Sequence, residues 1–398
     1  MNAAGSITKR KLSSGKLSWG FSFFAGRDEE GKRIQVTRSG FSTRKAAATA
    51  LAAAVERHQQ GLAVVRDGRS FGDFLRGWLD NHAARRVSPR TLEAYRQSAD
   101  YILRSLEDVP LARVTPRLLQ ETVYSLSESG GRDRKGNTRK LAPKTVRHAA
   151  FVVHGAYETA FRLGEVDVNP MARVELPKLE AKDPNIMSRD DVAKLLAIAE
   201  GTDLYALTVL ALGSGCRRGE LLALRWADID FESSTMRVSA SLEQTREGLR
   251  VKSTKSGKPR RVVLPVSTLR ILGEHRERQA AAQMKARALH GANFEDLGLV
   301  FANHDGRHLR PDRVSSAFCE MARKVGLKIG LHLLRHQSAS ELLSAGVPLP
   351  AVSQRLGHAS PSITSAIYAH ALSEDEQLAA QRWEAQFGSM FDAPKSKC

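Results

Sequence analysis

Hydrophobic and polar residues alternate near the start of the chain, and the spacing then becomes helical. In "KLSWGFSFFAG", Trp19, Phe21 and Phe23 occupy every second position, which is the period of a half-buried strand. A second strand is predicted in "GKRIQVTRSGF", after the turn-forming stretch "GRDEEGK". The alanine-rich segment 42–61 predicts a helix. Residues 1–64 are therefore expected to form a small β-sheet with one helix.

The hydrophobic spacing over residues 68–172 is helical throughout. Ser70 and Asp73 occupy capping positions before an apolar run. Two later segments, "SPRTLEAYRQSADYI" and "APKTVRHAAFVVHGAYETAF", begin with a small residue, a proline, a basic residue and a threonine. Proline fits the first helical turn, where an N–H group has no helical partner. Arg90 and Lys144 are then expected beside helix N-termini, which attract phosphate groups.

The stretch 173–187 carries two prolines, mixed charge and no hydrophobic period, which is typical of a linker. Ser188 and Asp191 then occupy capping positions before another apolar helix. Further helices are expected around "LYALTVLALGSG" and from "RPDRVSSAFCEMARKVG" onward, with a strand-rich patch at 228–265 between them. The chain is therefore predicted to be multi-domain and mainly α with small β elements, ending in an α-rich domain over 188–398 that contains a small sheet or hairpin.

The charge of the chain indicates a polyanionic partner. Its 398 residues include 61 Lys and Arg against 43 Asp and Glu, a net charge of +18. Such an excess is typical of nucleic-acid-binding proteins. Residues 1–64 alone carry an excess of seven positive charges, so they are predicted to form a DNA-contacting arm, with a solvated basic face as the alternative. Arg90 and Lys144 are predicted to contact DNA phosphates.

Cysteine content and hydropathy indicate in which cellular compartment the protein is expected. Cys216, Cys319 and Cys398 are too few and too scattered for a disulfide framework or a zinc site. The first residues, "MNAAGSITKRKL", lack the apolar region of a signal peptide. The apolar runs "AAATALAAAV" and "ALTVLAL" are too short to span a bilayer. We expect an intracellular protein with no membrane partner.

Four clusters in the last domain carry candidate chemistry, and the first is "GSGCRRGELLALRWADID". Arg217 precedes a helix predicted over 219–226. Arginine is electrostatically unfavourable at a helix N-terminus, unless it receives an external phosphate through its bidentate fork. A structural ion pair between Arg217 and Glu220 is the alternative.

The second cluster, "VKSTKSGKPRRVVLP", predicts a hairpin whose turn is dense in lysine. A lysine on such a turn could reach into a site when substrate arrives, although solvated charge is the commoner meaning of such a run. Lys252, Lys255 and Lys258 lie near the predicted bend, and Lys255 is favoured by its spacing to the closing strand.

The third cluster, "LHLLRHQSASELL", places His332, Arg335 and His336 at i, i+3 and i+4 on one helix face. Such a face suits an anion or a metal, and metal is disfavoured because no carboxylate or cysteine lies at ligand spacing nearby. His336 could equally be a core histidine. The fourth cluster, "LGHASPSITSAIYAH", contains His358 and Tyr368, and could alternatively be a helix-turn-helix.

Together the clusters supply what metal-free phosphoryl transfer requires. Arginines can stabilise the charge on phosphate oxygens in place of a metal ion. A tyrosine phenol has an unperturbed pKa of about 10, so it needs a base such as an imidazole, and a lysine can protonate the departing alkoxide. No cofactor or metal is expected.

In this order, "GCRRGE", the hairpin lysine, "HLLRH", "LGH" and the tyrosine resemble the active-site set of the tyrosine recombinases, specifically the phage-type integrases. The resemblance covers about residues 185–385. The middle segment is similar to the helical, SAM-like core-binding domain of that family, and residues 1–64 to its arm-site-binding module. The resemblance assigns roles to six residues. It implies phosphate binding by Arg217 and Arg335, general-acid catalysis by Lys255, acid–base catalysis by His332, phosphate support by His358 and nucleophilic attack by Tyr368.

The implied activity is site-specific integration or excision of a mobile element through a 3′-phosphotyrosyl intermediate. The implied partners are double-stranded DNA at core and arm sites, a homotetramer in the synapse, and possible DNA-bending accessory proteins and an excisionase. The implied location is the nucleoid in the cytoplasm of a bacterial host. A catalytically silent DNA-binding protein of the same fold and a type IB topoisomerase are the alternatives. In relatives a C-terminal helix docks on the neighbouring subunit, and "LSEDEQLAAQRWEAQF" is expected to form such a helix.

Overall fold

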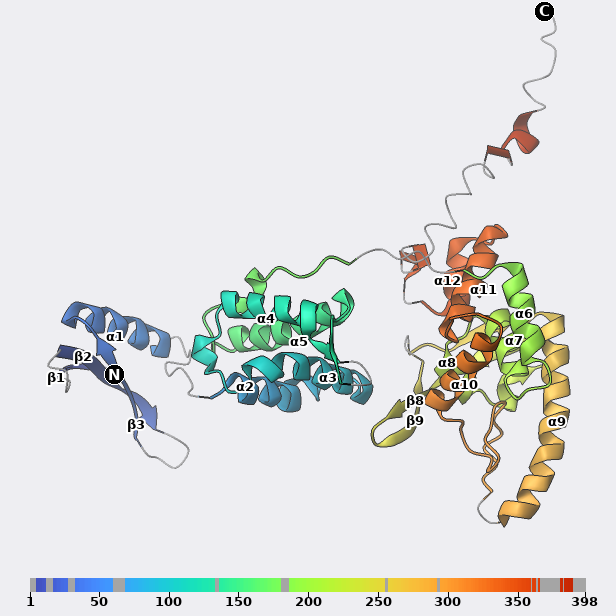
Figure 1. The fold of residues 1–398 in the computed structure, drawn as a ribbon, viewed down its shortest axis with the longest axis horizontal. Helices are drawn as coiled ribbons and strands as arrows, with labels where there is room; N and C mark the ends of the chain where they lie inside the picture. The colour runs from blue at the N-terminus through green and yellow to red at the C-terminus, as the bar shows by residue number, and fades with distance from the viewer. Residues whose placement is uncertain are drawn as a thin grey trace, which may run out of the picture. The chain divides into compact units, whose positions relative to one another are not determined.

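The computed structural model divides into two compact units, Met1–Glu180 and Ala181–Cys398 (Figure 1). The residues that it describes are 5–11, 17–27, 33–59, 69–132, 136–179, 186–254, 257–291, 294–358, 360–362, 364–365, 380–381 and 383–388. The division falls within the segment 173–187 that the sequence predicts as a linker. The fold class is the one predicted, mainly α with small β elements.

The first part of unit one is a three-stranded antiparallel sheet with a helix packed on it (Figure 1). Its elements are β1 (Ser6–Lys11), β2 (Leu17–Arg27), β3 (Arg33–Phe41) and α1 (Arg44–Gln59), and the strand order is β1-β2-β3. The predicted alternation is confirmed, because Phe21 and Phe23 are buried against Ala54 of α1. The sequence does not reveal β1, because Ile7 is its only apolar residue.

The second part of unit one is helical, as predicted. Its elements are α2 (Phe71–Trp78), a π-helical turn (Leu79–Ala83), α3 (Pro89–Leu106), a 3₁₀ turn (Leu111–Arg113), α4 (Pro116–Ser129), the short pair β4 (Gly131–Arg132) and β5 (Thr138–Arg139), α5 (Pro143–Arg162) and a 3₁₀ turn (Pro170–Arg173). The Asp73 N–H donates to Ser70 Oγ at 3.0 Å, which confirms the predicted cap. Pro89 and Pro143 both occupy the first helical turn, also as predicted.

Aromatic packing fills the core of this helical part. The ring of Tyr157 lies 5.0 Å from that of Phe74 and 6.2 Å from that of Phe71, between centroids. Tyr157 is 2% exposed, and its hydroxyl finds no hydrogen-bond partner among the residues described. Burial raises the pKa of this phenol above its usual range. The hydroxyl therefore carries a desolvation cost that no partner offsets.

We predict that Tyr157→Phe leaves the helical part as stable or stabilises it by about 1 kcal/mol, because it removes an unpaired buried hydroxyl and keeps the ring. Tyr157→Ala is the comparison variant, expected to cost roughly 3–5 kcal/mol through loss of the ring. Urea unfolding followed by fluorescence and circular dichroism measures both. A clear destabilisation by Tyr157→Phe would mean that the hydroxyl is paired in solution.

Unit two contains the predicted α-rich domain (Figure 1). Its helices are α6 (Arg189–Ala199), α7 (Tyr205–Ser214), α8 (Arg218–Ala223), α9 (Val266–His290), α10 (Pro311–Lys324), α11 (His332–Ser344) and α12 (Leu349–Leu356). Its strands are β6 (Ile229–Asp230), β7 (Thr235–Val238), β8 (Ala240–Thr245), β9 (Gly248–Ser253) and β10 (Arg260–Val263), and a 3₁₀ turn (Trp226–Asp228) precedes them. One large hydrophobic core contains Leu210, Met236 and Phe318, all fully buried, and a smaller one joins α11 to α12 through Leu343 and Leu356. The Asp191 N–H donates to Ser188 Oγ at 3.1 Å, which confirms the second predicted cap.

The predicted lysine-dense hairpin is wrong in its strand pairing. β9 pairs with β8, so the hairpin turn falls at residues 246–247, and Gly248 follows it with a φ of +132°. β10 pairs instead with β7, in a second sheet of order β10-β7-β6. Lys252 therefore lies inside β9, and Lys258 lies in the connection that leads into β10. The predicted helix over 219–226 also ends early, at Ala223, because Leu224 is extended.

Near the C-terminus, a π-helical turn covers Glu384–Gly388, and the rings of Trp383 and Phe387 lie 5.5 Å apart. Ser373 and Glu376, the predicted cap of a C-terminal helix, lie outside the described residues. Among the helices that the structure describes, none has the length and apolar character needed to cross a bilayer.

Candidate active site

The site is built around the turn between α7 and α8. Gly215 ends α7 with a φ of +66°, in the left-handed region that glycine adopts without strain. A Cβ atom here would lie 2.7 Å from Leu356 Cδ2, so a larger residue would also have to displace that side chain. Arg217 follows as the N-cap residue of α8. The predicted placement of this arginine at a helix N-terminus is therefore confirmed.

Arg217 is held by Glu220 and by a backbone carbonyl. Its N–H donates to Glu220 Oε2 at 2.9 Å, and its Nη1 donates to Glu220 Oε1 at 3.0 Å. Its Nη2 donates to the Gly357 carbonyl at 3.2 Å. The alternative ion pair with Glu220 is thus present. It does not bury the guanidinium, because 27% of the Arg217 side chain stays exposed and can meet a ligand.

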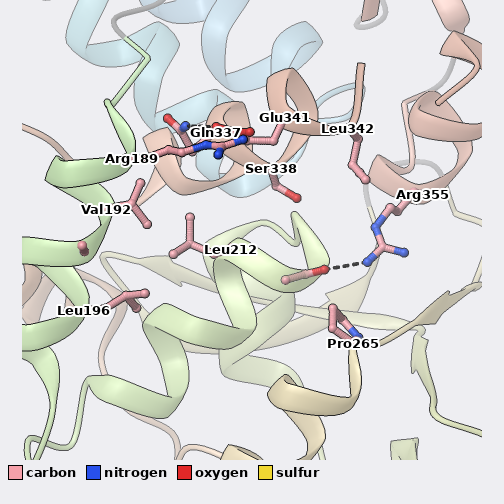
Figure 2. Close-up of a pocket in the computed structure, with 12 residues that line it drawn as sticks. Arg189, Val192, Leu196, Leu212, Pro265, Gln337, Ser338, Glu341, Leu342 and Arg355 are labelled. Atoms are coloured by element: carbon pink, nitrogen blue, oxygen red, sulfur yellow. Dashed lines mark hydrogen bonds between the residues drawn. The ribbon is translucent and has the colours of Figure 1, made fainter. Parts of the chain in front are cut away.

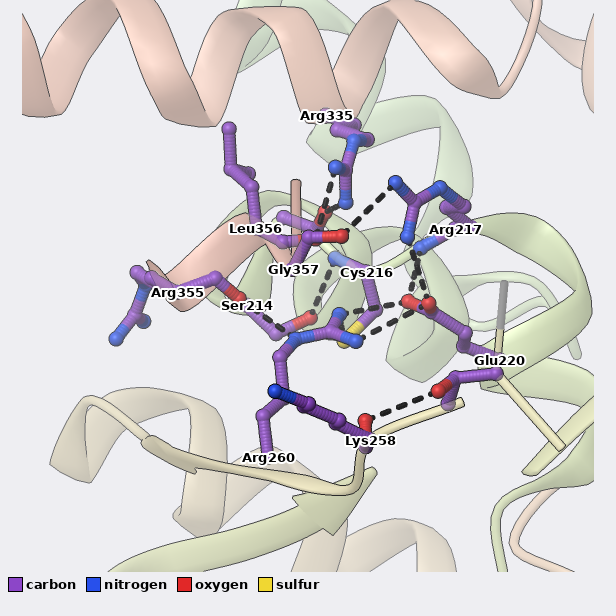
Figure 3. A network of polar contacts seen from close by, with 12 residues as sticks. Ser214, Cys216, Arg217, Glu220, Lys258, Arg260, Arg335, Arg355, Leu356 and Gly357 are labelled. Carbon is purple, nitrogen blue, oxygen red and sulfur yellow. Dashed lines mark hydrogen bonds and ion pairs between the residues drawn. The ribbon is translucent and has the colours of Figure 1, made fainter. Parts of the chain in front are cut away.

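Arg335, on the first turn of α11, lies deeper. Its side chain reaches two backbone carbonyls, with Nη1 2.7 Å from Gly215 O and Nη2 2.8 Å from Leu356 O. The residue is only 3% exposed. Burial, and then the positive charge of Arg217, lower the pKa of Arg335 to about 10, so it is still charged at neutral pH. These two carbonyl bonds fix the direction of the guanidinium (Figure 3).

Three histidines surround the arginines. The rings of His332 and His336 meet edge to face, with centroids 4.8 Å apart. His358 follows Gly357, its N–H donates to Ser353 O at 3.1 Å, and its Nδ1 is hydrogen-bonded to Thr364 Oγ1 at 2.7 Å. Burial and then neighbouring positive groups lower the pKa values of both His332 and His358 to about 4. Both imidazoles are therefore neutral at physiological pH and able to accept a proton or a hydrogen bond.

Sequence reasoning missed Arg260, the first residue of β10 (Figure 3). Its Nη1 and Nη2 donate to the two oxygens of Glu220 at 3.1 and 2.7 Å, and its Nε donates to Arg355 O at 2.8 Å. A signal for it exists in "RRVVLP", because Arg260 shares a strand face with the buried Val262, whereas Arg261 lies on the exposed face. A basic residue on the inward face of a strand implies a buried partner.

The electrostatic balance of the cluster favours an anion. Arg217, Arg260 and Arg335 carry three positive charges, and the Glu220 carboxylate, which pairs with the first two, carries one negative charge. Two positive charges are left over beside neutral imidazoles. Among the residues described, no group of three or more histidine, cysteine or carboxylate side chains could hold a metal ion. The arrangement suits a phosphate group better than a cation.

The other predicted site residues lie outside the described residues or in unit one. Lys255 and Tyr368 lie outside the described residues. Arg90 and Lys144 belong to unit one, where both are exposed at the first turns of α3 and α5, as predicted from their spacing to the prolines. Arg90 also pairs with Glu93, at 3.2 Å between Nη1 and Oε2.

Two of the five other tyrosines are poor candidates for a nucleophile. Tyr157 is buried in the helical part of unit one. Tyr205 begins α7, at the opposite end of that ten-residue helix from Gly215. With a rise of about 1.5 Å per residue, this places it roughly 15 Å along the axis from the turn.

A cavity of about 530 Å³ lies next to the cluster, among α6, α7, α11 and α12 (Figure 2). Apolar side chains form most of its lining, among them Val192, Leu196 and Leu212. Arg355 closes one end, with its Nη2 donating to Gly213 O at 2.6 Å (Figure 2). The apolar lining suits packing rather than catalysis.

Comparison with known proteins agrees with this site and fold. Residues 185–375 match the phage integrase family, residues 8–54 an arm DNA-binding domain, and residues 70–127 the N-terminal SAM-like domain of phage integrases. A tyrosine recombinase XerC-like protein of Caldanaerobacter subterraneus subsp. tengcongensis is 27% identical over 390 residues, 93% of this chain and 96% of that protein.

Solved structures share the fold. The Tn1549 transposon integrase in complex with a circular intermediate DNA has a TM-score of 0.64 at 18% identity, covering 79% of this chain and 99% of that one. A lambda integrase tetramer bound to a Holliday junction has a TM-score of 0.54 at 19% identity, covering 89% of this chain and 96% of that one. The three family matches and the arginine–histidine cluster define the class, a tyrosine recombinase with an arm DNA-binding domain. The chain belongs to the phage integrase family, which confirms the resemblance drawn from its motifs.

We predict that Arg217→Gln raises the pKa values of His332 and His358, because it removes a positive charge that disfavours protonation of both rings. The rise should stop short of the ordinary histidine value, because burial is the larger cause of the lowering. NMR titration of the ring Cε1–Hε1 signals in the DNA-free protein measures it. Arg261→Gln, a neutralisation on the exposed face of β10, is the control and should leave both values unchanged. A fall of either pKa in Arg217→Gln would contradict the electrostatic account.

Proposed function

We propose that this phage integrase family member is a site-specific DNA recombinase whose cleavage site is the arginine–histidine cluster at the α7–α8 turn. The observation that supports this most strongly is the excess of positive charge held beside neutral imidazoles without a metal cluster among the described residues. Arg217 and Arg335 would bind the non-bridging oxygens of the scissile phosphate. Preorganised donors of this kind stabilise charge that develops in a transition state.

Tyr368 is proposed as the nucleophile. Its phenol oxygen would attack phosphorus and form a 3′-phosphotyrosyl bond, while the bond to the 5′ oxygen of the next nucleotide breaks. His332 would accept the phenol proton, since its low pKa keeps it neutral. Lys255 would donate a proton to the departing 5′ oxygen, and His358 would support the phosphate. Attack by the freed 5′ hydroxyl of a partner strand would reverse these steps and rejoin the DNA without a cofactor.

The remaining segments are proposed to select the DNA sites. Residues 1–64 would bind arm sites. Residues 68–172 would bind the core site, with Arg90 and Lys144 on the DNA backbone. Residues 173–187 would link these parts to residues 188–398, which would form the catalytic domain. Binding should be salt-dependent, because phosphate contacts release counterions.

The assembly is proposed by analogy with the similar lambda integrase, which is solved as a tetramer on a Holliday junction. Four copies of this chain would join two duplexes, with the C-terminal tail docking on a neighbouring subunit. DNA-bending accessory proteins and an excisionase would direct integration or excision, at the nucleoid in the cytoplasm of a bacterial host. Neither a silent DNA-binding protein nor a type IB topoisomerase is favoured by any observation on this chain.

We predict that Tyr368→Phe abolishes the covalent protein–DNA adduct, because phenylalanine has no nucleophile. The ring is kept, so stability should change by at most about 1 kcal/mol, as for one hydrogen bond. Core-site binding should persist, since other residues supply the phosphate contacts. Denaturing electrophoresis with a nicked, labelled core site measures the adduct.

Tyr124→Phe is the matched control for this experiment, because Tyr124 is an exposed tyrosine of α4. It should form the adduct at the wild-type rate. An adduct from Tyr368→Phe would show that another tyrosine attacks, and peptide sequencing of the adduct would identify it.

We predict that deleting residues 1–64 spares cleavage of a short core site but impairs recombination between full-length sites. The reason is that this segment contains its own small core around Phe21, separate from the arginine–histidine cluster. Recombination assays on plasmids with and without arm sequences measure the difference. Full-site recombination at the wild-type rate by the truncated protein would reject the arm assignment.

A further inference from the structure

All three guanidinium nitrogens of Arg260 form hydrogen bonds inside the protein. Its side chain is 9% exposed. It forms a two-pronged pair with Glu220, donates from Nε to Arg355 O at 2.8 Å, and approaches Cys216 Sγ at 3.5 Å from Nη2. Among the described residues, these contacts engage four of its five N–H groups, so we expect its effect on DNA chemistry to pass mainly through the residues that it contacts.

The residues that it contacts are those that position the proposed catalytic groups. Glu220 is the partner that orients Arg217, through both a backbone and a side-chain hydrogen bond. Arg355 O belongs to the end of α12, directly before the Gly357–His358 turn. Arg260 itself follows Lys255 by five residues. One buried side chain therefore joins the segments that carry three of the proposed catalytic residues (Figure 3).

Gly357 shows how closely the turn is fitted to this guanidinium. A Cβ atom on Gly357 would lie 2.9 Å from Arg260 Nη1 and 3.1 Å from its Cδ. The backbone at Gly357 also has a φ of +67°, which side-chain-bearing residues rarely adopt. The turn can therefore lie against Arg260 only with glycine at this position. His358 follows Gly357 directly, so this turn sets the position of His358.

Charge explains why a neutral residue could not replace Arg260. Glu220 is 3% exposed, and burial alone would raise its pKa, but hydrogen bonds from Arg260 and Arg217 outweigh this and lower it. Without Arg260, the carboxylate would depend on Arg217 alone for compensation. Arg217 would then be drawn more firmly onto Glu220 and be less available to an external phosphate.

We propose that Arg260 is a positioning residue for strand cleavage, which holds Glu220 and the 355–358 turn so that Arg217 and His358 can face the scissile phosphate. The inference rests on the proposed function. A purely structural role would slow cleavage of any substrate. The proposed role predicts that the loss of Arg260 slows cleavage most when the scissile phosphate is charged.

The test compares Arg260→Gln with Arg261→Gln, which removes the same charge from the neighbouring exposed position of β10. Single-turnover cleavage is measured on two nicked core sites, one with an ordinary scissile phosphate and one with a neutral methylphosphonate there. Arg260→Gln should slow cleavage of the phosphate substrate by about 10²-fold, the effect of losing one charge-stabilising donor. On the methylphosphonate the loss should shrink to less than about tenfold, because less charge needs stabilisation. Arg261→Gln should cleave both substrates at the wild-type rates.

Equal losses on the two substrates would overturn the proposal, since a general loss of folded protein lowers both rates alike. Wild-type cleavage of the phosphate substrate by Arg260→Gln would overturn it as well. If Arg260→Gln does not fold, Arg260→Lys, which keeps a charge beside Glu220 but cannot form the two-pronged pair, is measured for the same difference between substrates. A wild-type chain that forms no adduct would instead reject the proposed function, a result distinct from these.

Discussion

One buried carboxylate constrains the whole active site. Glu220 is 3% exposed, and a charge in that position is strongly destabilising unless it is paired, with roughly 3–5 kcal/mol lost when one partner of a buried pair is removed. Arg217 and Arg260 both donate to its oxygens, so the start of α8 and the first residue of β10 must lie side by side. The pairing requirement of a single side chain thereby fixes where the α7–α8 turn meets the second sheet.

Backbone carbonyl groups hold the other contacts of the arginines in place. Arg335 donates to Gly215 O and Leu356 O, and Arg217 donates to Gly357 O, joining segments 120 and 140 residues apart in the sequence. Two of these carbonyls belong to glycines with positive φ, where the chain turns sharply and leaves its C=O groups without helical partners. The guanidiniums satisfy those groups and are oriented by them in return. In the proposed mechanism these donors would therefore be in place before a phosphate binds.

The sequence was most informative where the geometry is local. The N-cap position of Arg217, the shared face of His332 and Arg335, and the glycine turn before His358 each depend on a few consecutive residues, and the structure contains all three. The strand pairing could not be predicted from consecutive residues. Alternation of apolar and polar residues indicates that a segment is a strand but not which strand it pairs with. The lysine-rich segment was therefore assigned to the wrong hairpin. Arg260 was missed for the same reason, since its partner Glu220 is 40 residues away.

The positive charge proposed to bind the phosphate also lowers the basicity of His332, the proposed base. Partial burial and the nearby arginines keep the pKa of His332 at about 4, so in the DNA-free protein this imidazole has little affinity for a proton. A bound phosphodiester would add a negative charge next to the same arginines and reduce the repulsion that a protonated imidazole meets. The basicity of His332 should then rise, although burial would still hold it below the ordinary value. In the proposed mechanism the substrate itself would supply the charge that allows His332 to accept the proton of Tyr368, so the nucleophile would be activated only when a phosphate is in position to be attacked.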